Sequence, residues 1–228
     1  MPPEEVAAIF VEPIQGEGGY IVPPPEFHTE LYKAAKKYGI LYVADEVQSG
    51  MGRTGKMFAM EHFGVVPDII ALAKGIASGM PLDAMVAKSD IMVWEAGSHA
   101  STFGGNPVSC SAALATIELL ESELMENARI NGEYLIAGLR ELQKSIECMG
   151  DVRGKGLMIG VELVKDRVTK ERAGDWRNEV IQKAFAKGLL LLGCGENTIR
   201  FCPALTVTKD EIDACLSIFE ETLLDLAK

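Results

Sequence analysis

Three short apolar runs, each followed by a charged residue, organise the first part of the chain. The runs cover residues 6–11, 40–44 and 69–73. Runs of this length, rich in Ile, Val and Ala, are typical of strands that are buried on both faces of a parallel sheet. The charged residues that follow them are Glu12, Asp45 and Lys74. Because ligands of open α/β sheets bind beyond the carboxyl ends of the strands, the pattern predicts that these side chains face one crevice.

Helical segments are predicted between and after these strands. Residues 26–38 form a predicted helix that Gly39 ends, so the first two strands belong to a β-α-β unit and to a mainly parallel sheet. Asn106 and Pro107 are typical of an N-cap and a first helical position, and they predict a helix that runs to about residue 122. A second helix with one apolar face follows it.

The composition changes after Gly150 and predicts a second domain. Its predicted elements are strands at residues 152–164, 189–192 and 198–202, a helix at 175–187, and a last helix that begins with the capping box of Thr208 and Glu211. The boundary between the two domains is a helical connection. We therefore divide the chain into residues 1–122, a sheet domain with its connecting helix, and residues 123–228, a smaller α+β domain.

Length and charge narrow the class of protein. The chain has 228 residues, 48% of them hydrophobic, which is enough for a sizeable core. Its net charge of -11 argues against nucleic acid or an anionic membrane as a partner. No apolar stretch approaches the ~20 residues that a membrane span needs, and the first residues do not resemble a secretion signal. We expect a soluble, cytoplasmic protein.

Cysteine and histidine spacing adds two expectations. The five cysteines are an odd number without a CxxC pair, which favours reduced, buried thiols. The three histidines show no metal-ligand spacing, so we expect no metal.

The pairing of Lys74 with Asp45 is the strongest chemical signal. A lysine and an aspartate in one dry cleft are typical of pyridoxal phosphate enzymes, in which the lysine forms a Schiff base and the aspartate faces the pyridinium nitrogen. An ordinary ion pair is the alternative. Gly50 to Gly55 also spell the dinucleotide fingerprint GxGxxG. We reject nicotinamide binding because five residues separate the strand from its first glycine and the next strand ends in Lys74.

Three segments carry a resemblance to a known family. They are EPIQGEGGYIVPP, the stretch from ADEVQSG to GIASGMP, and STFGGNPVSCSAALATI. Together they resemble the class III pyridoxal-phosphate aminotransferases, and most of all the 4-aminobutyrate aminotransferases. The resemblance implies an α/β PLP-transferase of fold type I, of which this chain is the second part of the large domain plus the C-terminal small domain. It also implies that residues 84–88 form an antiparallel edge strand and that the family's first half is absent.

The resemblance assigns cofactor roles residue by residue. It implies that Lys74 bonds pyridoxal 5'-phosphate, that Asp45 binds the ring nitrogen, that Val47 packs on the ring and that Gln48 binds the ring hydroxyl. For catalysis we also expect Lys74 to sit in a desolvated position, since only an unprotonated amine attacks the cofactor. Thr102 matches a phosphate contact made from the neighbouring subunit, which implies a homodimer with shared active sites. Taken alone, Thr102 would be a plain turn residue.

Substrate recognition is predicted at Arg200. This residue alternates with the apolar Ile199 and Phe201, so it faces the other way and can bind a carboxylate bidentately. In the family that arginine binds the α-carboxylate of glutamate or 2-oxoglutarate, and a glutamate that matches Glu17 covers it for other substrates. Glu12 matches a further active-site glutamate. The implied reaction is amino transfer from an ω-amino acid such as 4-aminobutyrate to 2-oxoglutarate.

Other functions share almost all of these residues. Ornithine aminotransferase, acetylornithine aminotransferase and an amino-acid racemase of the same fold all remain open at this point. A catalytically silent fragment is the alternative from another class. The family's first half supplies most of the contacts to the cofactor phosphate, so we expect the chain alone to bind the cofactor weakly. A sheet without its other strands exposes an edge and an apolar face, so we also expect self-association.

Overall fold

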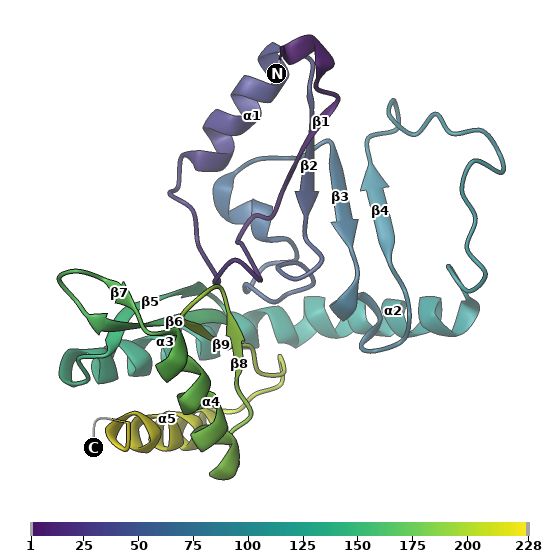
Figure 1. The fold of residues 1–228 in the computed structure, drawn as a ribbon. Helices are drawn as coiled ribbons and strands as arrows, with labels where there is room; N and C mark the ends of the chain where they lie inside the picture. The colour runs from purple at the N-terminus through teal and green to yellow at the C-terminus, as the bar shows by residue number, and fades with distance from the viewer. Residues whose placement is uncertain (1, 227–228) are drawn as a thin grey trace. The chain divides into compact units, whose positions relative to one another are not determined.

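The computed structural model describes residues 2–226, which form two compact units joined within one chain (Figure 1). The first unit holds residues 2–13 and 23–123 of this range, and the second holds residues 14–22 and 124–226. The short segment 14–22 therefore leaves the first unit and belongs to the second. Both units combine helices with a β-sheet, which confirms the α/β class.

The first unit is built on a four-stranded sheet with the order β1-β2-β3-β4. The strands are β1 (Ala8–Val11), β2 (Leu41–Asp45), β3 (Ile69–Leu72) and β4 (Ala84–Ala87). The first three run parallel and β4 pairs antiparallel with β3. The three apolar runs and the antiparallel edge strand were thus predicted correctly.

The first unit contains the two helices that were predicted near residues 26–38 and 106–122, together with shorter helical elements that were not predicted. The helical elements are η1 (Pro3–Glu5), α1 (Phe27–Lys37), η2 (Ala59–Phe63), η3 (Lys74–Ala77), α2 (Pro107–Leu119) and the π-helical turn η4 (Leu120–Leu124). Gly39, with a φ of 69°, follows α1 as predicted. Asn106 caps α2, since its side chain accepts a hydrogen bond from the Ser109 N–H at 2.9 Å.

One face of the first sheet packs against α1. Tyr42 and Ala44 of β2 are fully buried and form a cluster with Ala35 of α1. Asp68, just before β3, is also buried; it accepts the Tyr42 N–H at 2.8 Å and forms ion pairs with Lys36 and, at 2.7 Å, with Lys88. Burial alone would raise the pKa of Asp68, but these partners outweigh it and hold the pKa at about 2. A buried charge network therefore fixes the start of β3.

The other face of this sheet is more open. Phe10 of β1 is 75% exposed and Met85 of β4 is 40% exposed. The register places Phe10 beside Val43, and Met85 beside Ala71, which in turn lies beside Asp45. This apolar exposure supports the expected self-association, which stays a prediction.

The second unit has an antiparallel sheet with the order β5-β6-β9-β8, to which β7 adds along β6. The strands are β5 (Met149–Lys155), β6 (Met158–Asp166), β7 (Glu171–Arg172), β8 (Leu192–Cys194) and β9 (Thr198–Phe201). The single strand predicted over residues 152–164 is wrong. Gly156, with a φ of 53°, opens a tight turn inside that run and folds it into the β5-β6 hairpin.

Three helices complete the second unit. They are α3 (Met125–Ser145), α4 (Gly174–Ala186) and α5 (Lys209–Leu224). Leu139 of α3, Phe219 of α5 and Ile199 of β9 are all fully buried in its core. The capping box of α5 forms as predicted, because Thr208 and Glu211 each accept the other's backbone N–H. Among the described helices, none is both long and apolar enough to cross a membrane.

Candidate active site

The carboxyl ends of β1, β2 and β3 meet at one edge of the first sheet. Val11 lies beside Ala44, so Glu12 follows at the level of Asp45, and Asp45 lies beside Ala71. Lys74 comes three residues after Ala71, as the first residue of η3. The strand register therefore gathers the two carboxylates and the amine at the same sheet edge.

Asp45 ends β2 in a half-buried position. Its Oδ1 accepts a hydrogen bond from the Val47 N–H at 3.0 Å. Val47 and Gln48, the predicted ring contacts, are half-buried in the turn that follows. The turn therefore holds the carboxylate of Asp45 in place and leaves it partly accessible.

Glu46, which was not assigned from the sequence, stabilises this turn through hydrogen bonds. Its carboxylate is buried; it accepts the Ser49 hydroxyl at 2.6 Å and the backbone N–H groups of Ala59 at 3.0 Å and Met60 at 2.8 Å. Burial raises the pKa of Glu46, although these donors oppose the rise. A Cβ on Gly50 would lie 2.8 Å from the Glu46 carbonyl oxygen, so only glycine fits there. The glycine close behind the acidic pair in DEVQSG was the available signal.

Lys74 differs from the expectation. It is exposed in the structure, whereas we expected a desolvated side chain. The backbone turns at Lys74 from β3 into η3 with a φ of 49°, which is uncommon for a residue other than glycine. The Ser78 hydroxyl, hydrogen bonded to that of Thr116 at 2.9 Å, ties the end of η3 to α2. The amine thus projects from an anchored turn.

Thr102 lies in the exposed loop that precedes α2. The neighbouring Ser101 hydroxyl accepts the Gly104 N–H at 3.1 Å, so this part of the loop is a turn. The role of Thr102 toward a second subunit stays a prediction.

His28 is a second buried residue that the sequence reasoning did not assign. Its Nδ1 lies 2.7 Å from the Tyr42 hydroxyl and its Nε2 lies 2.9 Å from the Pro13 carbonyl oxygen. Because a carbonyl only accepts, Nε2 carries the proton and Nδ1 accepts from Tyr42. Burial lowers the pKa of His28, so the neutral ring is favoured. This ring fixes the backbone beside Glu12.

In the second unit, Arg200 meets Glu17. The side chains of Ile199 and Phe201 are buried in the core, and Arg200 faces the other way, as the alternation predicted. Its Nη1 donates to Glu17 Oε1 at 2.5 Å, with the Arg200 side chain 19% exposed and that of Glu17 73% exposed. Burial alone would lower the pKa of Arg200, but the Glu17 carboxylate outweighs it and raises the pKa.

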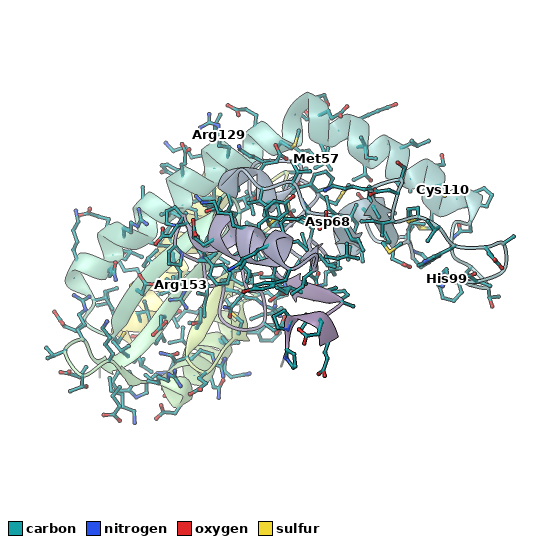
Figure 2. All side chains as sticks on the ribbon, turned by 90° about the horizontal axis from the view of Figure 1, so that it is seen from above. Met57, Asp68, His99, Cys110, Arg129 and Arg153 are labelled. Atoms are coloured by element: carbon teal, nitrogen blue, oxygen red, sulfur yellow. The ribbon has the colours of Figure 1, made fainter. Side chains whose placement is uncertain are left out.

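The segment 14–22 that carries Glu17 is folded onto its own unit. The Glu17 carbonyl accepts the Gly195 N–H at 2.7 Å, and Gln15 pairs with Ile21. Tyr20 is buried in a cluster with Met158 and Cys194. Arg153, labelled in Figure 2, also contacts this segment and was not singled out from the sequence.

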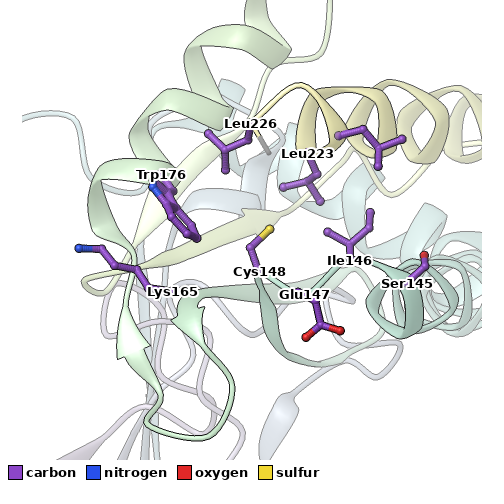
Figure 3. Close-up of a pocket in the computed structure, with 9 residues that line it drawn as sticks. Ser145, Ile146, Glu147, Cys148, Lys165, Trp176, Leu223 and Leu226 are labelled. Atoms are coloured by element: carbon purple, nitrogen blue, oxygen red, sulfur yellow. The ribbon is translucent and has the colours of Figure 1, made fainter. Parts of the chain in front are cut away.

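A cavity of about 480 Å³ lies elsewhere in the second unit (Figure 3). Apolar side chains dominate its lining, which consists of Ser145, Ile146, Glu147, Cys148, Lys165, Trp176, Leu223, Leu224 and Leu226. No residue of the predicted site is among them.

A parallel-sheet edge that presents a lysine and an aspartate is a feature of pyridoxal phosphate enzymes. The chain belongs to the class III aminotransferase family, whose model, described as "Aminotransferase class-III", matches residues 2–223. The cofactor of this family is pyridoxal 5'-phosphate. The described residues fit it, since the sheet edge supplies an amine that solvent reaches and a carboxylate fixed by the Val47 N–H.

Named relatives differ in activity. A leucine/methionine racemase of Thermococcus litoralis is 46% identical over 223 residues, which are 97% of this chain and 50% of the relative. An acetylornithine aminotransferase of Caldanaerobacter subterraneus is 44% identical, over 98% of this chain and 55% of the relative. The chain thus spans about half the length of the curated relatives it matches.

Solved transaminases share the fold over nearly the whole chain. A transaminase from the marine bacterium Virgibacillus superposes with a TM-score of 0.94 at 33% identity, over 99% of this chain and 54% of that one. An amine transaminase from an uncultivated Pseudomonas species, solved in its PLP-bound form, gives a TM-score of 0.91 at 35% identity, over 99% of this chain and 53% of that one. The fold is therefore that of the PLP-dependent transaminases.

Proposed function

We propose that the chain takes part in a transamination that moves an amino group from an ω-amino acid such as 4-aminobutyrate to 2-oxoglutarate. The observation that carries the proposal is the ion pair of Glu17 with Arg200. In this proposal, residues 1–122 are the second part of the cofactor-binding large domain and residues 123–228 are the small domain.

The first unit would hold the cofactor. Lys74 would bond it through the amine, Asp45 would bind the ring nitrogen as an anion, and Val47 and Gln48 would contact the ring face and its hydroxyl. When bound, pyridoxal phosphate supplies a ring that takes up the negative charge left after a proton leaves the substrate carbon. The carboxylate of Asp45 would keep the ring nitrogen protonated. Its fixed, half-buried position supports that task.

The second unit would select the substrate. A free Arg200 guanidinium binds a carboxylate through two parallel hydrogen bonds, which suits the α-carboxylate of glutamate and 2-oxoglutarate. An ω-amino acid carries no carboxylate next to its amino group, so a covered arginine suits it better. Glu17 provides such a cover, and its exposed side chain can leave without breaking the core. We assign Glu12 to substrate binding as well, on the family resemblance.

The assembly proposed with this reaction is a homodimer in the cytoplasm. Thr102 would reach the phosphate of the cofactor in the neighbouring subunit, from the exposed loop before α2. The partners of the enzyme would be amino acids and 2-oxo acids.

Racemisation is the second candidate, and the 46% identity to a leucine/methionine racemase favours it. A racemase removes a proton from the α-carbon and returns it to the opposite face, so it needs no 2-oxo acid. The same lysine and aspartate serve both reactions, and only the fate of the amino group separates them.

Product analysis tests the proposal, and it uses the holoenzyme, by which we mean a complete, cofactor-loaded enzyme that contains this chain. One series supplies 4-aminobutyrate, ornithine or N-acetylornithine together with 2-oxoglutarate, and glutamate is measured. A second series supplies L-leucine or L-alanine alone, and the D-enantiomer is measured. We expect the highest kcat/KM with 4-aminobutyrate. Faster formation of D-amino acid without any 2-oxo acid would establish racemisation instead. No product in either series would show that the chain is catalytically inactive.

A further inference from the structure

One arginine of the second unit holds the backbone of the segment that carries Glu17. Arg153 lies on β5 with its side chain 16% exposed, and Figure 2 labels it. Its Nε donates to the carbonyl oxygens of Gly19 and Tyr20, each at 3.2 Å, and its Nη2 donates to the Gly19 oxygen at 2.8 Å. A single guanidinium thus binds two consecutive carbonyl groups, two and three residues after Glu17.

The sheet fixes the same guanidinium from the other side. Nη1 forms ion pairs with Asp151 and Glu162, each at 2.8 Å, and Nη2 also donates to the Thr198 hydroxyl at 3.1 Å. Burial alone would lower the pKa of Arg153, but the two carboxylates outweigh it and raise the pKa. The planar fork of five donors allows this set of contacts, which a lysine ammonium cannot reproduce.

We call these contacts of Arg153 the Arg153 clamp. Around it, the segment 14–22 lies close to the sheet of the second unit. A Cβ on Gly160 would lie 3.0 Å from Tyr20 Cβ, and a Cβ on Gly195 would lie 2.9 Å from the Gly18 carbonyl oxygen. The Gly195 N–H itself donates to the Glu17 carbonyl at 2.7 Å. That amide proton is therefore a direct reporter of whether the segment is docked.

We propose that Arg153 is a positioning residue that keeps Glu17 over Arg200 and so sets the preference between ω-amino and α-amino donors. The inference rests on the proposed role of Glu17 as the cover of Arg200. An ion pair whose partner is as exposed as Glu17 contributes little stability by itself. The position of Glu17 therefore depends on the contacts that hold the backbone of its segment, and among these Arg153 binds two consecutive carbonyl groups. Without them Arg200 is uncovered more of the time, which favours substrates with an α-carboxylate.

Amide hydrogen exchange at Gly195 tests the clamp without any need for activity. The variant is Arg153→Met, and Arg167→Met is its matched control. Arg167 also donates to backbone carbonyls of the second unit, those of Gln143, Ile146 and Glu147, but it does not touch the segment. We expect exchange at Gly195 to be at least tenfold faster in Arg153→Met and unchanged in Arg167→Met. Equal exchange in Arg153→Met and the wild type would overturn the proposal.

Half-reaction kinetics on the holoenzyme test the consequence for specificity. The ratio of kcat/KM for 4-aminobutyrate to that for glutamate should fall at least fivefold in Arg153→Met, mainly through KM for 4-aminobutyrate. The change should be smaller in Arg153→Lys and absent in Arg167→Met. An unchanged ratio together with faster exchange at Gly195 would refute the specificity role.

Failure of the proposed function and failure of the role of Arg153 give different results. If the wild type turns over neither donor, the proposed function fails, and exchange at Gly195 still decides whether Arg153 docks the segment. If Arg153→Met does not fold, Arg153→Lys carries both measurements, with changes in the same direction expected. An Arg153→Lys protein that matches the wild type in both would then overturn the proposal.

Discussion

The two regions that carry the candidate chemistry are held in place in different ways. At the sheet edge of the first unit, Asp45 is the last residue of β2 and Lys74 follows β3 by two residues, so strand register alone brings them together. In the second unit, Glu17 and Arg200 are 183 positions apart and meet because Arg153 and Gly195 bind the backbone of the segment. Substitutions at the sheet edge should therefore alter chemistry, whereas those around Arg153 should alter selection between substrates.

The largest effect is expected at Lys74. In the holoenzyme, Lys74→Ala should reduce turnover on the order of 10³-fold, since it would remove the amine that we propose bonds the cofactor. Lys56→Ala is the control, because Lys56 is also exposed and lies in the loop that leads to η2. Steady-state turnover of both variants checks this. Similar losses in the two would mean that Lys74 has no special role.

The next effect is expected at Asp45. Asp45→Asn should slow turnover by about 10²- to 10³-fold, because in the proposed site the ring nitrogen would lose its anion. The fold should persist, since an asparagine Oδ1 can still accept the Val47 N–H. Turnover and the thermal midpoint are to be measured together. Near-normal turnover in a folded Asp45→Asn protein would count against the assignment.

A smaller and selective effect is expected at Arg200. Arg200→Ala should cost the glutamate half-reaction about 2 to 3 kcal/mol, the value of one bidentate charge-assisted contact, and should cost the ω-amino half-reaction much less. The control is Arg172→Ala, since Arg172 pairs with Glu196 in the same unit. Single-turnover rates for the two donors provide the comparison. Equal damage to both half-reactions would rule out the role of Glu17 as a cover.

The smallest effect concerns pH and His28. Burial holds the pKa of His28 in the folded protein below its usual value of about 6.5, so the unfolded chain takes up the proton first as the pH falls. Stability should therefore decrease as the pH drops below about 6.5. Urea midpoints between pH 7.5 and 5.5 measure this, and His28→Gln should flatten the curve while His99→Gln, at an exposed site, should not. A wild-type midpoint that does not fall over this range would show that His28 is not held neutral.

The sequence predicted the parts of the fold that depend on local pattern. Apolar runs located β1, β2 and β3, and the Asn106 and Thr208 caps located the starts of α2 and α5. The β5-β6 hairpin was missed because glycines recur at 154, 156 and 160 through this stretch, and the sequence does not tell which of them marks the two-residue turn at 156–157. Periodicity indicates which positions are buried, but it does not indicate where the chain reverses direction between two strands.

The candidate site was predictable to the same extent. Strand ends gave Asp45 and Lys74, and alternation gave the outward direction of Arg200. Gly50 was the one sequence signal for the buried Glu46, whose backbone donors lie 13 and 14 residues away. The contacts of Arg153 gave no signal, because its carbonyl acceptors lie more than 130 residues away in the sequence. The φ of 49° at Lys74 was not predicted either, because a lysine in the sequence gives no signal of a left-handed backbone conformation.

The identity of the lysine that bonds the cofactor tests the central claim most directly. The holoenzyme is reduced with borohydride, which fixes the cofactor to its lysine, and the labelled peptide is mapped by mass spectrometry. We predict one label, on Lys74, because it is the lysine at the sheet edge that also presents Asp45. A label on any other lysine of the chain would contradict the account.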